Sequence, residues 1–312
     1  MEKEKSQIRE AMLTIEQLEK EYPFVDLMLD AGFKHVFCRP ANKEILLEFL
    51  NSIIPDRTIV DINYSQNEQV PENIESRASR FDLHCTTDDG THIIVEMQRN
   101  EQRDYIERSI YYSGLPMFEQ VRIGYDRYHF KPIYSVNILN FTLEVTAHRE
   151  EVLSAFRYKE INDNTLLSDR KTLIYIELPK FKKRVEELDR ENVLEIFYFC
   201  LRNISKLKKI PSSLQSDLAK RIFLASATAA MTTTEKMQYI RAMNTKRDIE
   251  NQIQFAEEKG IEKGIERGVE IGVEKGVKEE KNAIAREMKT DGMAIDLIMK
   301  YTGLTKEQIE AL

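Results

Sequence analysis

The chain has 312 residues, 42% of them hydrophobic, and a formal net charge of −7. This length and composition predict a globular protein of two or three units without a membrane span or a signal peptide, which we expect in the cytoplasm. The acidic balance excludes a protein that binds nucleic acid through a general excess of Lys and Arg. The cysteines have neither zinc-site spacing nor a disulfide framework, so we expect three buried thiols: Cys38, Cys85 and Cys200.

Helical and strand patterns alternate from the start of the chain. Residues 1–22 are highly charged with weak helical periodicity, and we expect a frayed leader there. Residues 42–54 carry apolar side chains at helical spacing, and Pro55 ends the predicted helix. A strand is expected around residues 58–64.

The most informative pattern is a predicted hairpin over residues 79–98. If Asp88, Asp89 and Gly90 form a three-residue loop with glycine in the left-handed region, Asp82 lies opposite Glu96. A two-residue turn would place Asp82 opposite Met97 instead. In the three-residue register one face is expected to be core, namely Phe81, Leu83, Cys85, Ile93, Val95 and Met97. The other face is then polar, with Asp82, His84, Thr86, His92, Glu96 and Gln98.

Opposed carboxylates on neighbouring strands are destabilising, because their Cβ atoms lie roughly 5 Å apart. Asp82 and Glu96, beside the amide of Gln98, therefore predict a shared cation, and hard oxygen ligands of this kind suit Mg²⁺ or Mn²⁺. The Met97 carbonyl could complete the ligand set, and Gln98 could orient a water or bond a phosphate but cannot supply positive charge. Spacing alone leaves a solvated polar face as the alternative.

Other polar groups near the hairpin have two readings. His84 and His92 could assist proton transfer or could serve only as hydrogen-bonding groups. Basic and aromatic side chains could contact nucleic acid, although surface and core roles are commoner for such residues: Arg77, Arg80, Arg99, Arg103, Arg108, Tyr105, Tyr111 and Tyr112, with Lys and Arg in residues 180–184 and 206–209.

The following segments predict a mixed α/β sheet and then helices. Residues 103–120 read as a helix that bends or ends near Gly114 and Pro116. Residues 131–141 and 172–178 are short, apolar and rich in β-forming residues, so both are predicted strands. Only helical patterns remain over residues 188–258, which predicts a helical lobe.

From residue 260 the sequence repeats every four residues as Gly-[Ile/Val]-Glu-[Lys/Arg], with the glycines at Gly260, Gly264, Gly268, Gly272 and Gly276. Each interior glycine weakens a helix by roughly 1 kcal/mol relative to alanine. We favour a glycine-faced helix that makes a homo-oligomer through residues 260–280 over a half-ordered spacer. Residues 283–312 predict a small helical hairpin, with a DNA-reading helix-turn-helix as the alternative.

These residues resemble the PD-(D/E)XK nuclease superfamily, whose core is a helix, a three-stranded meander, a helix and a further strand. Within it the chain is most similar to the Rpn family of recombination-promoting nucleases, also described as transposases. The resemblance covers roughly residues 24–280. It rests on Asp30-Ala31-Gly32-Phe33-Lys34-His35-Val36-Phe37 with Phe49-Leu50-Asn51, on Arg80-Phe81-Asp82, on Ile94-Val95-Glu96-Met97-Gln98, and on Ile176-Glu177-Leu178-Pro179-Lys180-Phe181.

The resemblance implies a restriction-endonuclease-like α/β core with one acidic site. Asp82 matches the metal-binding aspartate, Glu96 the second acidic ligand, and Gln98 the position usually held by lysine in the superfamily. Asp30 matches an acidic position that could reach the metal through water, and an N-cap or turn carboxylate is the rival interpretation. The implied activity is a Mg²⁺-dependent DNA endonuclease, with Mn²⁺ as a substitute.

The predicted organisation is a leader, a nuclease-like core, a helical lobe, a repeat helix and a helical hairpin, at residues 1–22, 23–187, 188–258, 259–281 and 282–312. A second functional hypothesis is a nuclease-like fold without turnover that binds DNA or assembles with proteins. The neutral Gln98 and the acidic net charge are compatible with it. The intact set of Asp82, Glu96 and Gln98 favours the enzyme.

Overall fold

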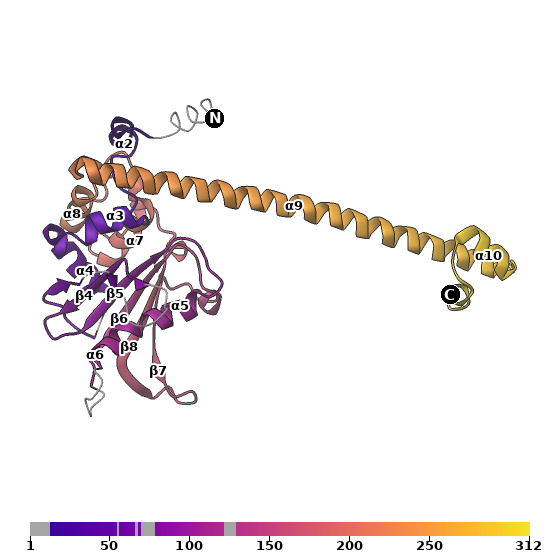
Figure 1. Ribbon diagram of the computed structural model, residues 1–312, viewed down its shortest axis with the longest axis horizontal. Coiled ribbons are helices and arrows are strands. Elements are labelled where there is room, and N and C mark those ends of the chain that lie inside the picture. The colour runs from indigo at the N-terminus through magenta and orange to yellow at the C-terminus, as the bar shows by residue number, and fades with distance from the viewer. Residues whose placement is uncertain (1–12, 55, 66–67, 70–78, 122–128) are drawn as a thin grey trace. The chain divides into compact units, whose positions relative to one another are not determined.

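The computed structural model describes residues 13–54, 56–65, 68–69, 79–121 and 129–312. The chain divides into two compact units, residues 1–244 and 245–312, and each is described by itself (Figure 1). The boundary between the units falls inside the long helix α9 (Thr233–Thr290).

The first unit is built on a six-stranded mixed sheet with the strand order β1-β4-β5-β6-β8-β7. Its strands are β1 (Ile62–Tyr64), β4 (Leu83–Thr87), β5 (His92–Gln98), β6 (Ile133–Leu139), β7 (Leu153–Lys159) and β8 (Leu166–Glu177). The pairs β5–β6 and β6–β8 are parallel, and the others are antiparallel. A separate two-stranded ribbon pairs β2 (Glu68–Gln69) with β3 (Ser79–Arg80). The predicted mixed α/β class is confirmed, and β7 is a strand that the sequence patterns did not predict.

The hairpin β4–β5 has the three-residue loop and the register predicted for it. Leu83 pairs with Val95, and the register continues without a shift to the turn. Gly90 has φ +83°, which is the left-handed conformation that favours glycine in this loop. The two-residue alternative is therefore excluded.

One face of the sheet is covered by helices α3 (Asp30–Phe37), α4 (Lys43–Ile53), α7 (Val193–Asn203) and α8 (Asp217–Ala225) (Figure 1). Side chains of these helices share one hydrophobic cluster with the strand residues Leu83, Cys85, Ile93 and Val95, and Met97 packs against it partly buried. The helices α7 and α8 thus pack on the same core as the sheet.

The opposite face of the sheet is covered by α5 (Tyr105–Tyr112) and α6 (Leu115–Gln120), which are separated near Gly114 and Pro116 as predicted. Phe81 packs on this face with Ile94 and Ile133, so its expected place on the main core face is wrong. The chain is in a bend at residue 82, before β4 begins, and this breaks the alternation that the prediction extended back to Phe81. The face is therefore largely buried where the sequence suggested a polar surface.

The leader is partly ordered. Helix α2 (Ile15–Glu21) begins with a capping box between Thr14 and Gln17, and Leu18 is fully buried in the main core. The expectation of a frayed leader is wrong for residues 13–22, and residues 1–12 lie outside the described part of the chain.

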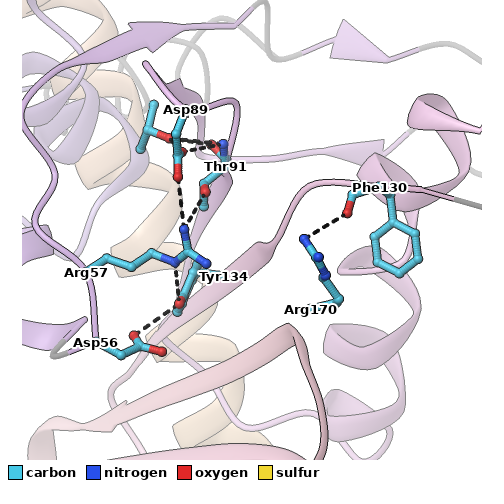
Figure 2. A network of polar contacts seen from close by, with 8 residues as sticks. Asp56, Arg57, Asp89, Thr91, Phe130, Tyr134 and Arg170 are labelled. Carbon is cyan, nitrogen blue, oxygen red and sulfur yellow. Dashed lines mark hydrogen bonds and ion pairs between the residues drawn. The ribbon is translucent and has the colours of Figure 1, made fainter.

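Arg57 ties the loop after α4 to the hairpin turn and to β6. Its Nη1 donates to Asp89 Oδ2 at 3.0 Å and to Thr91 Oγ1 at 3.2 Å (Figure 2). Its Nε donates to the hydroxyl of Tyr134 at 2.9 Å, and that hydroxyl donates to Asp56 Oδ1 at 3.0 Å. The network anchors the turn end of the hairpin.

The second unit contains the rest of α9, with α10 (Ile295–Thr302) and α11 (Lys306–Glu310). A small cluster of Ala285, Ile298, Leu304 and Ile309 joins the three helices. Gly303 ends α10 in the left-handed region, and Thr305 with Gln308 forms the capping box of α11. Over the described ranges, no helix combines the length and apolarity that a membrane span requires.

Short 3₁₀ turns complete the structure, at Pro40–Asn42, Glu144–Thr146, Leu178–Lys180, Val185–Glu187, Ile204–Lys206 and Thr228–Ala230. All three cysteines are free. Cys85 and Cys200 are buried as predicted, whereas Cys38 is partly exposed.

Candidate active site

The side chain of Asp82 accepts a backbone hydrogen bond at the end of the hairpin. The N–H of Thr87 donates to the carbonyl of Thr91. Counting from this pair, every second residue of the hairpin is at a hydrogen-bonded position, and Met97 is at one of these positions. Strand β4 begins only at Leu83, and the N–H of Met97 donates to Asp82 Oδ2 at 2.6 Å instead of to a backbone acceptor. Because N–H and C=O of one residue in a strand point the same way, the Met97 carbonyl faces the edge on which Asp82 lies.

Asp82 and Glu96 occupy the next pair of positions beyond the last paired residues of the hairpin. Glu96 Oε1 is buried and has no hydrogen-bond partner among the described residues. Burial, and then the charge of Asp82, raises the pKa of Glu96 well above its usual value. Burial also raises the pKa of Asp82, against the opposing effect of its hydrogen bond from Met97. The two carboxylates therefore titrate as a pair that retains a proton more readily than isolated groups do.

Asp30 approaches this pair from helix α3. It is the first residue of the helix, whose N-cap is Leu29, so the N-cap interpretation of Asp30 is excluded. Its Oδ1 forms an ion pair with Lys34 Nζ at 2.7 Å. The charge of Asp30 raises, and that of Lys34 lowers, the pKa values of both hairpin carboxylates. The start of α3 thus lies within electrostatic reach of the site.

Gln98 is held from both ends of its amide. Its Nε2 donates to the carbonyl of Asn100 at 2.8 Å, and its Oε1 accepts from Arg108 Nη2 at 2.6 Å. The guanidinium of Arg108 lies over the ring of Tyr105 at 5.3 Å and that of Tyr112 at 5.9 Å. Gln98 therefore brings a cation to the site, although its own side chain is neutral.

Helix α5 forms the wall that covers this side of the sheet. The hydroxyl of Tyr105 donates to Asn137 Oδ1 at 2.9 Å, and Asn137 pairs with Glu96 in the parallel register of β5 and β6. Burial raises the pKa of Tyr105, and the charge of Glu96 contributes. Tyr105 and Asn137 are both buried, so they shield this part of the site from solvent.

His84 and His92 share a face with the carboxylates but interact with each other. His84 Nε2 and His92 Nδ1 are 3.1 Å apart, and the two rings are stacked. Burial, and then the neighbouring His92, lowers the pKa of His84 to about 4, and burial lowers that of His92. The contact between the two rings favours the hydrogen-bonding interpretation, and His84 Nδ1 is buried without a hydrogen-bond partner among the described residues.

The donor set of the site suits a hard divalent cation. Among the described residues no group of three or more His, Cys, Asp and Glu side chains is arranged as a metal cluster. The predicted set needs only Asp82, Glu96 and the carbonyl of Met97. The orphaned Glu96 Oε1 and the raised pKa values of both carboxylates are the features that a bound cation would relieve, so the residues fit a hard divalent cation.

Sequence reasoning did not assign Arg108 or Asn137 to this site. Arg108 lies ten positions from Gln98 along the chain, and hairpin spacing carries no information about such a contact. The parallel pairing of β5 and β6 would have indicated this contact, because the helix that connects two parallel strands packs on the sheet beside them.

Five of the basic side chains proposed as DNA contacts have acidic or backbone-carbonyl partners. Arg99 pairs with Asp26 at 3.1 Å, and Lys180 pairs with the buried Glu177 at 2.9 Å. Lys183, Arg184 and Lys208 contact Glu195, Glu187 and the Glu21 carbonyl, respectively. Arg77 and the side chain of Arg80 lie outside the described residues. These pairs reduce the positive charge of the candidate patches.

The chain matches a known protein family. A family model described as PD-(D/E)XK nuclease family transposase matches residues 27–256, which include both carboxylates, Asp30, Gln98 and Arg108. The comparison with curated proteins and the comparison with solved structures each returned no match.

Proposed function

Because the chain belongs to the PD-(D/E)XK nuclease family transposases, we propose that it is a metal-dependent endonuclease that hydrolyses phosphodiester bonds in DNA. Family membership supports a nuclease or transposase-like function. The observation that carries the finer proposal is the half-buried carboxylate pair of Asp82 and Glu96, in which the buried Oε1 of Glu96 has no hydrogen-bond partner among the described residues. Such a pair is destabilising unless a cation or a proton lies between its members.

Asp82, Glu96 and the Met97 carbonyl would hold Mg²⁺, with Mn²⁺ as a substitute. The bound cation would polarise the phosphate and lower the pKa of the attacking water. The Met97 N–H would fix the rotamer of Asp82, and the burial of Glu96 Oε1 would limit the access of bulk water to this oxygen. Asp30 would act through water from the start of α3. Gln98 would hold the guanidinium of Arg108, which donates a hydrogen bond to its amide oxygen.

The test is cleavage of supercoiled plasmid by the full-length protein in Mg²⁺ and in Mn²⁺, with a chelator control. We expect nicked or linear product from the wild type and none from Asp82→Ala or Glu96→Ala. Asp89→Asn is the matched control, because it removes a carboxylate of the same hairpin at the opposite end. Metal-dependent cleavage that survives both Ala variants would exclude this site, and a wild type that cleaves under no condition would contradict the proposed activity.

A catalytically inactive module that binds DNA or assembles with proteins is the second candidate. The observation that favours it is the neutral amide at Gln98, which provides less stabilisation to a transition state than an ammonium group would. The same plasmid assay decides between the candidates when it is paired with a gel-shift measurement. Binding without cleavage across metals and substrates would support the module.

Self-association through residues 260–280, and a cytoplasmic location, complete the proposal. In this segment the β-branched side chains of the repeat are exposed, with Ile261 and Ile265 at 63% and Val269 and Val273 at 61%. A second copy of the chain would bury them. Deletion of residues 260–280 is expected to lower the molar mass in light scattering, whereas an unchanged monomer would contradict self-association.

A further inference from the structure

Arg108 is a cation whose partners within the described part of the chain are neutral. Its Nη2 donates to Gln98 Oε1 at 2.6 Å, and its Nη1 donates to Gln102 Oε1. An amide oxygen fixes the direction of a guanidinium without cancelling its charge, whereas a carboxylate would cancel it. Arg108 therefore retains both its full charge and unused donors of its fork.

The position of this guanidinium is fixed in advance of any ligand. Arg108 lies over the rings of Tyr105 and Tyr112, which are three residues before it and four after it on helix α5. Tyr105 is itself held by its hydrogen bond to the buried Asn137. Because the rings and the two amides restrict its rotamers, little side-chain entropy remains to be lost when an anion binds.

Arg108 lies on the side of the sheet that carries Glu96. Gln98, whose amide oxygen accepts from Arg108 Nη2 at 2.6 Å, is two residues beyond Glu96 on the same face of β5. Tyr105, over whose ring the guanidinium lies, donates to Asn137, the β6 partner of Glu96. Another cation, Lys34 of α3, is ion-paired with Asp30 at 2.7 Å. Arg108 is therefore the better placed of these two cations to meet an additional negative group beside the carboxylates.

We propose that Arg108 binds the scissile phosphate of DNA and supplies the positive charge that the strand position of Gln98 lacks, with Gln98 as its positioning residue. The inference rests on the proposed nuclease function and assigns the recognition of the phosphodiester at the same site. A preorganised guanidinium would stabilise the charge that develops on the phosphate oxygens during hydrolysis. The hairpin thereby supplies the carboxylates, and helix α5 supplies the guanidinium.

The first test compares single-turnover cleavage by the wild type, Arg108→Met and Lys159→Met. Lys159 is exposed on β7 and pairs with the start of β8, at the opposite end of the sheet from Gln98, so its removal gives the same change of charge far from the site. We expect Arg108→Met to slow cleavage by about 100-fold or more and Lys159→Met by less than about threefold. Placing a lysine on the strand, as Gln98→Lys in the Arg108→Met protein, should restore at least tenfold. Cleavage by Arg108→Met within threefold of the wild type would overturn the inference.

The second test does not depend on turnover. The Asp82→Asn protein, with and without Arg108→Met, is titrated with a fluorescein-labelled DNA duplex at several salt concentrations. Removal of Arg108 should weaken binding about tenfold and reduce the salt slope by about one phosphate contact, and Lys159→Met should change both less. Equal affinities and slopes would overturn the inference. If the wild type cleaves no DNA, the proposed function fails, and this titration alone decides the role of Arg108.

Folding is controlled in both tests by circular dichroism. If Arg108→Met does not fold, Arg108→Gln removes the charge, keeps an amide donor, and is subject to the same thresholds. A loss of cleavage in Arg108→Gln that Gln98→Lys fails to restore, together with unchanged DNA binding, would indicate a structural role and would also overturn the inference.

Discussion

Asp82 and Glu96 occupy the two positions just beyond the last paired residues of the hairpin, and the N–H of Met97 donates to Asp82 Oδ2 at 2.6 Å. Glu96 Oε1 is buried without a hydrogen-bond partner in the described structure. The difference makes Glu96 the carboxylate whose ionisation costs the folded protein more. It also makes the metal-free site a source of instability that depends on pH.

Glu96→Gln is expected to stabilise the metal-free protein, increasingly so toward alkaline pH. The folded-state pKa of Glu96 is raised above its usual 4.5, so the unfolded chain releases the proton first as pH rises. The contribution of Glu96 to stability is fully present below about pH 4.5 and is lost through neutral and alkaline pH. At pH 8 we expect a gain of roughly 1–3 kcal/mol in the free energy of unfolding, measured by urea denaturation. A gain that is the same at pH 5 and pH 8 would contradict this assignment.

Binding of Mn²⁺ at pH 7 is expected to release roughly one proton, because the cation replaces the proton shared by the carboxylate pair. Titration calorimetry in buffers of different ionisation enthalpy measures this number directly. Glu96→Gln should abolish the release. Asp89→Asn is the control: hydrogen bonds from Thr87 and Thr91 and the charge of Arg57 hold the pKa of Asp89 at about 2, so this group carries no proton to release. A binding enthalpy that does not change with the buffer would contradict the prediction that Asp82 and Glu96 share a proton at pH 7.

The register of the hairpin could be predicted from sequence because its determinants are local. Alternating side chains and a glycine with φ +83° fix which residues face each other, and both can be read within a dozen residues. The break between α5 and α6 is equally local, since it depends on Gly114 and Pro116.

The features that were missed depend on contacts distant in sequence. Strand β7 is at the edge of the sheet and exposes Tyr158 and Lys159, so its pattern lacks the apolar run of a buried strand. The burial of the hairpin face results from α5 and α6, and the contact between Gln98 and Arg108 results from the crossover to β6. These relationships follow from topology, which the local pattern does not determine.

Gly32→Ala is expected to lower the free energy of unfolding by roughly 1–3 kcal/mol, because a Cβ at this position would lie 2.1 Å from the backbone oxygen of Asp26. The chain before α3 approaches the helix too closely for any side chain. Gly276→Ala is the matched control, since nothing lies within 4 Å of its added Cβ. Urea denaturation should show a loss only for Gly32→Ala, and equal stability of both variants would refute the close approach.

The last prediction separates a glycine-faced contact from an exposed spacer in α9. A Cβ added at Gly264, Gly268 or Gly272 meets no atom within 4 Å in the single chain, and alanine favours a helix over glycine by roughly 1 kcal/mol per position. The triple Ala variant should therefore be more helical in circular dichroism. If two copies approach through the glycines, the added methyl groups hold the backbones apart, and light scattering should show dissociation at about tenfold higher concentration.

Gln252→Ala with Gln254→Ala is the control for this measurement, because it changes neutral exposed residues of the same helix outside the repeat. It should leave the molar mass unchanged. Greater helicity of the triple variant with no change in self-association would show that the glycines do not lie at the contact. The exposed Ile and Val side chains would then remain the groups that a second copy covers, and Ile265→Glu with Val269→Glu would be the variant expected to yield monomers.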